Sequence, residues 1–239
     1  MKKSVLISGS LWDYILSLII GLVFLSSCNT THFTTVNNMR NINGKIYLLN
    51  DTILEGNVTI GLDGSWGNKS YVEILEKGRK KITKVMVEDI NEVYVRNNYY
   101  QPKIIDTGIF GGEIIRFLKR ITKSDSKIQL FEYHTQSTVN SGFGPRSGSY
   151  NEDNFKYYVS LPFHNRYECF NINGEDIVPD MERKVSKFFD ECPKLTKKIK
   201  NKEDGFYYSF FTGSADKKIN IWTNIIEEYD KCMEINKGK

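Results

Sequence analysis

The chain has 239 residues, of which 40% are hydrophobic and 26% are charged, with 33 basic and 29 acidic side chains. The chain contains fourteen Phe, fourteen Tyr and three Trp, but only five Pro and eighteen Gly. This composition excludes a disordered, collagen-like or low-complexity chain. The net charge of +4 is spread along the chain and forms no basic block, so we expect no nucleic-acid partner.

The first 28 residues predict export from the cytoplasm. Lys2 and Lys3 are followed by an uncharged apolar run over residues 15–25. A helix of that length rises only about 16 Å, and a bilayer core needs roughly 20 apolar residues. A cleaved signal peptide over residues 1–27 is therefore favoured over a transmembrane helix.

The residues that follow the apolar run are Leu25-Ser26-Ser27-Cys28. They resemble the lipobox of bacterial lipoproteins, in which an aliphatic residue and two small residues precede the cysteine that is acylated. The resemblance implies that Cys28 becomes the lipidated N-terminus and anchors the mature protein to a membrane. Asn29 stands where an Asp would imply retention in the inner membrane, so we expect an outer-membrane lipoprotein that faces the periplasm.

Three cysteines remain after Cys28, in an oxidising compartment, which predicts one disulfide and one free thiol. Cys192 ends one predicted helix and Cys232 lies near the end of the last, so these two are placed to staple the helices together. Cys169 falls in a predicted strand, where we expect a buried, inert thiol. Neither a CxxC motif nor a zinc-binding Cys/His spacing occurs, so we expect no metal and no cofactor.

The mature chain divides into a tether, a β domain and a helical tail. Residues 28–43 are rich in Thr and Asn without a period, which predicts a lipidated tether. Residues 44–178 alternate and predict antiparallel strands at 45–49, 54–60, 71–76, 81–87, 93–96, 113–121, 127–133, 155–161 and 166–172. Residues 135–154, dominated by Ser, Gly and Asn, predict a mobile surface loop. We expect an α+β fold with a meander curled into a barrel or cup.

Residues 179–239 change to a period of 3.6 and predict helices that pack on the β domain. Asp180 is the expected N-cap of a first helix, and Pro193 begins a second short one. Ser214 or Asp216 begins the last helix. Its apolar stripe consists of Trp222, Ile225, Ile226, Tyr229, Cys232 and Met233.

Three groups of motifs are similar to those of a family of uncharacterised bacterial lipoproteins and exported proteins. They are Gly44-Lys45-Ile46 with Asp51 and Gly56, then Phe117-Leu118 with Leu130-Phe131-Glu132-Tyr133, and a tail with Asp190-Glu191-Cys192-Pro193-Lys194-Leu195, Ile199, Tyr229 and Cys232. The resemblance covers most of the mature chain. It implies that Cys192 pairs with Cys232, and it implies no particular activity.

The catalytic signals are weak. The one nucleophile arrangement to consider combines Cys169 with His134 or His164, but a cysteine in mid-strand lacks the helix N-terminus that lowers a thiol pKa. We therefore expect a non-catalytic envelope lipoprotein with a structural or protein-interaction role. The alternative is a glycan or small-ligand binder, with an aromatic β cup that presents tyrosines such as those at 99–100 and 157–158, closed by the 135–154 loop.

Overall fold

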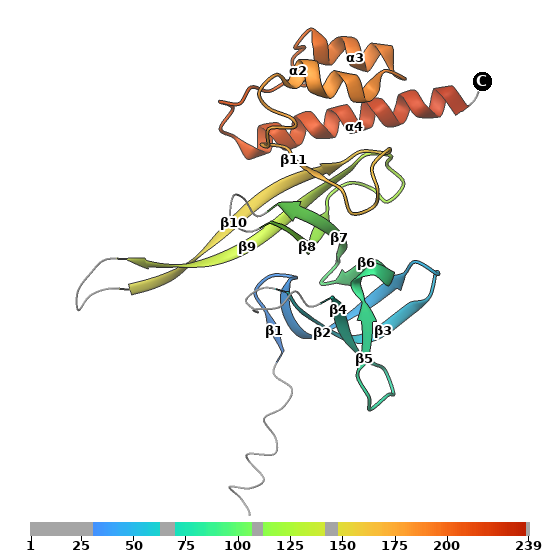
Figure 1. Ribbon diagram of the computed structural model, residues 1–239, viewed down its shortest axis with the longest axis vertical. Helices are drawn as coiled ribbons and strands as arrows, with labels where there is room; N and C mark the ends of the chain where they lie inside the picture. Colours follow the sequence, from blue (N-terminus) through green and yellow to red (C-terminus); the bar gives the residue numbers. More distant parts are fainter. Residues whose placement is uncertain (1–30, 63–69, 107–111, 142–147, 238–239) are drawn as a thin grey trace, which may run out of the picture.

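The computed structural model describes residues 31–62, 70–106, 112–141 and 148–237. Within these residues, eleven strands form one antiparallel sheet in the order β11-β10-β9-β8-β7-β6-β2-β3-β4-β5, with β1 paired to β2. Figure 1 shows the sheet curled into a half-barrel, with the helices packed at the end that is remote from β1. The predicted α+β class with a curled antiparallel sheet is confirmed. The strands are β1 His32–Phe33, β2 Asn38–Leu48, β3 Ile53–Gly61, β4 Tyr71–Glu76, β5 Thr83–Met86, β6 Ile90–Val95, β7 Asn98–Asp106, β8 Glu113–Arg120, β9 Gln129–Ser141, β10 Gly148–Ser160 and β11 Phe170–Asn171.

The first half of the sheet curls around a core made by alternate residues of β2 to β6. The chain passes from β5 to β6 through the 3-10 helix η1 Val87–Asp89, and β6 then pairs with β2. Period-two alternation sends one set of side chains inward, including Ile46, Val58, Ile74 and Val93, all fully buried. These strands form because their sequences alternate β-branched and polar residues.

The β domain begins earlier than the predicted boundary at residue 44. Residues 32–43 contribute β1 and the first half of β2, so the predicted tether is wrong over this stretch. Met39 and Ile42 are buried. Asn37 is also fully buried, and its amide nitrogen donates to the Phe117 carbonyl at 3.0 Å while its oxygen accepts from the Phe117 N–H at 2.8 Å.

Strand β7 was not among the predicted strands, because Pro102 interrupts its pattern. Pro102 lies opposite Phe117 of β8 and has no N–H to donate. Both Phe117 backbone groups bond to Asn37 on the side away from β7, so the Pro102–Phe117 pair exchanges no hydrogen bonds and β8 needs no N–H from residue 102. The buried side chain of Asn37, the residue before β2, thus takes the place of a neighbouring strand beside Phe117.

The second half of the sheet has a core on each face. Leu130 joins the helical core, whereas the next residue, Phe131, joins a small cluster with Ile105, Leu118 and Tyr158 on the opposite face. The segment before β11 returns to β7, where the Tyr167 carbonyl accepts from the Ile104 N–H at 2.8 Å. The predicted strand over residues 166–172 is reduced to β11, because residues 166–169 form this turn and crossing.

The helical tail comprises α2 Met181–Lys184, the 3-10 helix η2 Val185–Phe189, α3 Pro193–Lys200 and α4 Ala215–Lys237. Asp180 is not a side-chain cap: its φ is 68° and its carboxylate pairs with Arg183 at 3.1 Å. The Ser214 hydroxyl does accept the Lys217 N–H at 3.3 Å, as expected for the start of the last helix.

Trp222 anchors the tail to the sheet. Its side chain is fully buried, and its indole N–H donates to the Tyr208 hydroxyl at 3.0 Å. The Tyr208 hydroxyl donates in turn to the Ile172 carbonyl beside β11 at 2.6 Å. The predicted apolar stripe of α4 is buried over Trp222, Ile225, Ile226 and Tyr229, and Cys232 and Met233 are partly buried against the same core.

Candidate functional site

Strands β9 and β10 continue beyond the body of the protein as a two-stranded hairpin. We call its outer part, residues 134–141 and 148–155, the arm. The two strands pair without a bulge from Gln129 opposite Ser160 to Ser141 opposite Gly148. Figure 1 shows the arm extending away from the rest of the sheet. The predicted loop over residues 135–154 is therefore wrong over the described residues, which are regular strand, while residues 142–147 lie outside the described part.

A ladder of polar side chains holds the arm together where no apolar face does so. The Thr138 hydroxyl donates to Asn151 at 3.0 Å, and Gln136 donates to Asp153 at 3.1 Å. On the other face, Asn154 donates to Ser137 at 3.2 Å. Cross-strand pairs of this kind each contribute less than about 1 kcal/mol, so the arm is regular but has no core of its own.

The sheet forks at the base of the arm. Strand β8 pairs with β9 only at Lys119 opposite Glu132 and at Arg120 opposite Phe131. Beyond Glu132, β9 pairs with β10 alone within the described residues. The Asn37 side chain bonds to the β8 backbone at Phe117, two residues beyond the last pair at Lys119. Among the residues that the structure describes, the outer part of β9 is therefore an open sheet edge.

A small hollow of about 190 Å³ lies at this fork. Its walls combine the apolar side chains of Phe33, Val36 and Tyr100 with the polar side chains of Asn98, Lys119, Glu132 and His134. A concave site with an apolar wall and a few convergent polar groups is the usual form of a small-molecule site.

The polar side chains Lys119, Glu132 and His134 of the hollow each have a close partner. Lys119 lies 3.5 Å from Glu132, and His134 lies 2.9 Å from Asp153 and stacks on Phe155. The hydrogen bond from His134, with a further one from Gln136, lowers the pKa of Asp153. Burial raises the pKa of Tyr100, so its hydroxyl stays protonated and can donate. The hollow thus presents the protonated Tyr100 hydroxyl beside the ion pair of Lys119 and Glu132.

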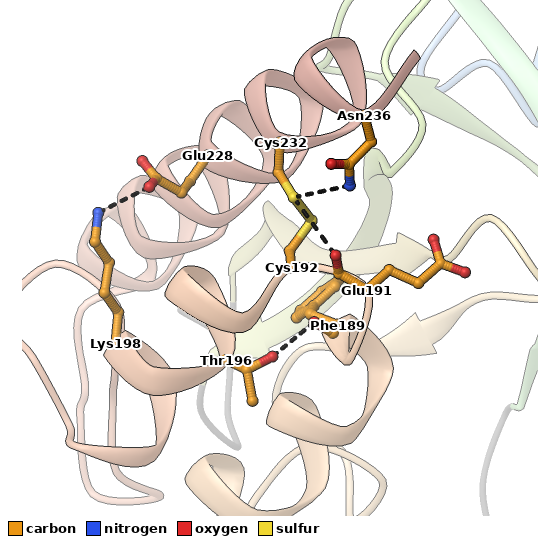
Figure 2. The surroundings of a disulfide bond; sticks show 8 residues. All are labelled: Phe189, Glu191, Cys192, Thr196, Lys198, Glu228, Cys232 and Asn236. Carbon is orange, nitrogen blue, oxygen red and sulfur yellow. Dashed lines mark hydrogen bonds and ion pairs between the residues drawn. A yellow bond between two sulfur atoms is a disulfide. The ribbon is translucent and has the colours of Figure 1, made fainter. Parts of the chain in front are cut away.

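The predicted disulfide is present: Cys192 and Cys232 are bonded, their Cα atoms are 6.1 Å apart, and the two residues are 40 positions apart in sequence. Figure 2 shows the bond joining the start of α3 to α4, beside an ion pair of Lys198 and Glu228 at 3.0 Å. The predicted lipidation residue, Cys28, lies outside the described residues.

The sheet separates Cys169 from His134. Cys169 packs on the cluster with Phe131 and Tyr133, and successive strand residues face opposite sides, so His134 points away from it. The Cys169 thiol donates to the Ile104 carbonyl at 3.3 Å, and burial raises its pKa to about 12. A thiol that stays protonated at neutral pH is a poor nucleophile. His164 packs among Phe163 and Phe170, and burial lowers its pKa.

The aromatic pairs noted in the sequence divide between the two faces. Tyr100 faces the hollow, whereas Tyr99 is exposed on the other face and packs against Tyr94 and Tyr47. Tyr158 lies in the small cluster, and Tyr157 packs on the helical side near Glu132. The structure therefore brings only Tyr100 of these four to the candidate site.

Sequence reasoning missed Phe33, Val36 and Asn37, because they lay within the predicted tether. Their only signal is the apolar pair Phe33 and Val36 amid polar residues. The arm strands also carried a weak signal, since Thr135, Thr138 and Val139 are β-branched and residues 135–141 contain no proline.

In the described part of the chain, no three His, Cys, Asp or Glu side chains are grouped so that they could hold a metal ion. Among the same residues, no helix has both the length and the apolar character needed to cross a membrane. No protein-family model, curated protein or solved structure matches this chain. The family resemblance of the sequence motifs stays a prediction.

Proposed function

We propose that this chain is an exported, non-catalytic lipoprotein of the bacterial cell envelope that acts by contacting another envelope component through the arm. The signal peptide and the Leu25-to-Cys28 motif support export and an acyl anchor at Cys28 in the outer membrane, facing the periplasm. Residue 28 lies only a few positions before β1, so the anchor holds the β1 end of the protein close to the membrane.

The arm is the observation that carries the interaction role. An isolated two-stranded hairpin is at best marginally stable in water, and three or more strands or a packed face normally support it. Here each strand is 13 residues long, yet residues 149–156 of β10 are all exposed, and no other described strand pairs with β9 beyond Glu132. A strand pair with so little burial against the described part of its own chain is suited to bury a face against another molecule.

Site-specific photo-crosslinking in intact cells tests this proposal. A photoreactive residue at Tyr150 of the arm, which is 55% exposed, should give discrete crosslinked products. The control places the same residue at Ile53 of β3, which is also 55% exposed but lies outside the arm. Products that form at residue 53 as readily as at 150, or at neither, contradict the proposal.

The alternative is a glycan or small-ligand binder, and the hollow at the fork favours it. Tyr100 and Phe33 would pack on the ligand while Asn98 and Glu132 bond to its polar groups. A ligand at 100 times its dissociation constant stabilises the protein by about 2.7 kcal/mol, which a thermal-shift panel of glycans and lipids detects. A shift that survives in Tyr100→Ala places the ligand elsewhere, and the absence of any shift removes this alternative.

A further inference from the structure

Hydrogen bonds at the base of the arm determine which backbone groups face its open edges. The Leu130 carbonyl accepts from the Ile121 N–H at 2.8 Å, and the Leu130 N–H donates to the Thr122 hydroxyl at 3.2 Å. The backbone of Leu130 therefore points away from β10. Backbone direction alternates along an antiparallel strand, and the pairing contains no bulge. Gln136 and Thr138 thus present their N–H and C=O groups at the open edge of β9.

The opposite edge follows the same rule. The Tyr157 carbonyl of β10 accepts from the Ile172 N–H at 3.0 Å, so Tyr157 points away from β9. By alternation, Asn151 and Asp153 point outward along β10. Because Thr138 lies opposite Asn151, the two residues of one cross-strand pair face the two opposite edges of the arm.

The two edges differ in charge. Residues 135–139 of β9 carry no charge and no proline, and their pairing with β10 has no bulge. Natural sheets use charges, prolines and bulges to keep exposed edges from pairing, so this edge lacks the usual protection. The β10 edge carries Glu152 and Asp153, which would face like charges if that edge paired with itself.

We propose that the β9 edge of the arm pairs antiparallel with the same edge of a second copy of this chain. In this register Gln136 lies opposite the partner's Thr138, and Ser137 lies opposite the partner's Ser137 on a two-fold axis. The contact uses the same surface on both copies, so the assembly ends at a dimer and does not grow into a chain. Figure 1 shows the arm projecting from the rest of the sheet, and the antiparallel register places the two bodies at opposite ends of the paired arms.

This inference rests on the proposed role of the arm as an interaction surface, and it names the partner. Short strand edges bury less than the roughly 1,200 Å² of a standard stable interface, so the dimer should depend on concentration. Confinement to a membrane by the acyl anchor raises that concentration. Experiments are therefore best made on the full chain in its own membranes.

Disulfide trapping tests the register. Residues that face each other without mutual hydrogen bonds have Cα atoms about 4.5 Å apart, within the range that a disulfide spans. Ser137→Cys should therefore give a disulfide-linked dimer on a non-reducing gel of whole membranes. Asn151→Cys, on β10 of the same arm, should stay monomeric, and the native Cys169 is present in both variants as a common background.

A matched pair of prolines tests the edge. In the Ser137→Cys chain, Thr138→Pro removes an outward N–H of β9, and Asn151→Pro removes an outward N–H of β10. Both lose the same Thr138 to Asn151 side-chain hydrogen bond, so any weakening of the arm is shared. The dimer should be lost only with Thr138→Pro. Loss with both prolines, or retention with both, overturns the assignment to the β9 edge.

The outcomes also separate this inference from the proposed function. If Ser137→Cys stays monomeric while photo-crosslinks from residue 150 reach a different protein, the second copy is the wrong partner and the interaction role stands. If neither Ser137→Cys nor residue 150 forms any product, both proposals fail.

Discussion

The buried pair of Lys103 and Cys169 predicts an unusual dependence of stability on pH. Lys103 is 3% exposed, its ammonium donates to the Arg166 carbonyl at 2.5 Å, and it lies 4.6 Å from the centre of the Phe131 ring. Burial lowers its pKa from 10.5 to about 8. Burial raises the pKa of Cys169 from 9.0 to about 12.

The signs of the two effects are opposite. Between pH 8 and 10.5 the unfolded state binds the Lys103 proton and the native state does not, so the free energy of unfolding rises by about 1.4 kcal/mol per pH unit. Between pH 9 and 12 the native state keeps the Cys169 proton that the unfolded state has lost, so stability falls with the same slope. The sum is a rise of about 1.4 kcal/mol from pH 8 to 9 and a plateau from pH 9 to 10.

Urea denaturation at half-unit steps from pH 7 to 10 measures these slopes. Cys169→Ala should extend the rise to pH 10, for a total of about 2.7 kcal/mol, because the opposing group is gone. Lys103→Met should remove the Lys103 contribution, so the rise becomes much smaller and a fall follows above pH 9; Lys218, whose pKa burial also lowers, is common to both proteins. Restricting the comparison to pH 10 and below avoids the buried Tyr158 and Tyr208, whose pKa values are raised above 10. Parallel profiles for the wild type and Lys103→Met between pH 8 and 9 would refute the reasoning.

Three further predictions concern the disulfide, a buried hydrogen-bonding side chain and a close backbone approach. Cys192→Ala combined with Cys232→Ala should lower the free energy of unfolding by about 4 kcal/mol in the loop-entropy account, and a loss below about 1 kcal/mol in urea would contradict it. Asn37→Ala leaves two buried backbone groups of β8 unpaired and should cost about 3 kcal/mol in the same assay, whereas no loss would mean that other groups satisfy them. Gly56→Ala places a Cβ 2.1 Å from a β4 carbonyl oxygen and should lower the free energy of unfolding by about 1–3 kcal/mol. The control Gly213→Ala has open space around its Cβ and should lower it far less. Equal losses of stability would argue against the close approach at Gly56.

Elements defined by local pattern could be predicted from the sequence. The α4 stripe that contains Trp222 and Tyr229 follows a 3.6 period, and it is buried as expected. The strand at residues 71–76 matches β4 because its alternation is regular and its ends are polar. The pairing of Cys192 with Cys232 followed from the family resemblance, and the helices do bring the two together.

Elements that depend on distant partners could not be predicted. Asn37 is a buried residue only because Phe117, 80 positions later, offers it two backbone groups. Pro102 is tolerated in β7 because its pair with Phe117 of β8 exchanges no hydrogen bonds, a feature of the register that the local sequence does not reveal. The arm is polar on both faces, so it lacks the alternation that identifies a half-buried strand, and its Ser, Asn and Gly content is typical of a loop. Regular pairing with a partner strand outweighs that local preference.

The envelope lipoprotein proposal is tested most directly by the intact mass of the native protein from its own membranes, measured before and after alkylation without reductant. The account predicts a chain that begins at an acylated Cys28 and carries one alkylated thiol, at Cys169 after unfolding, with Cys192 and Cys232 still bonded. A chain that retains residues 1–27, or that shows three or four reactive thiols, would contradict it.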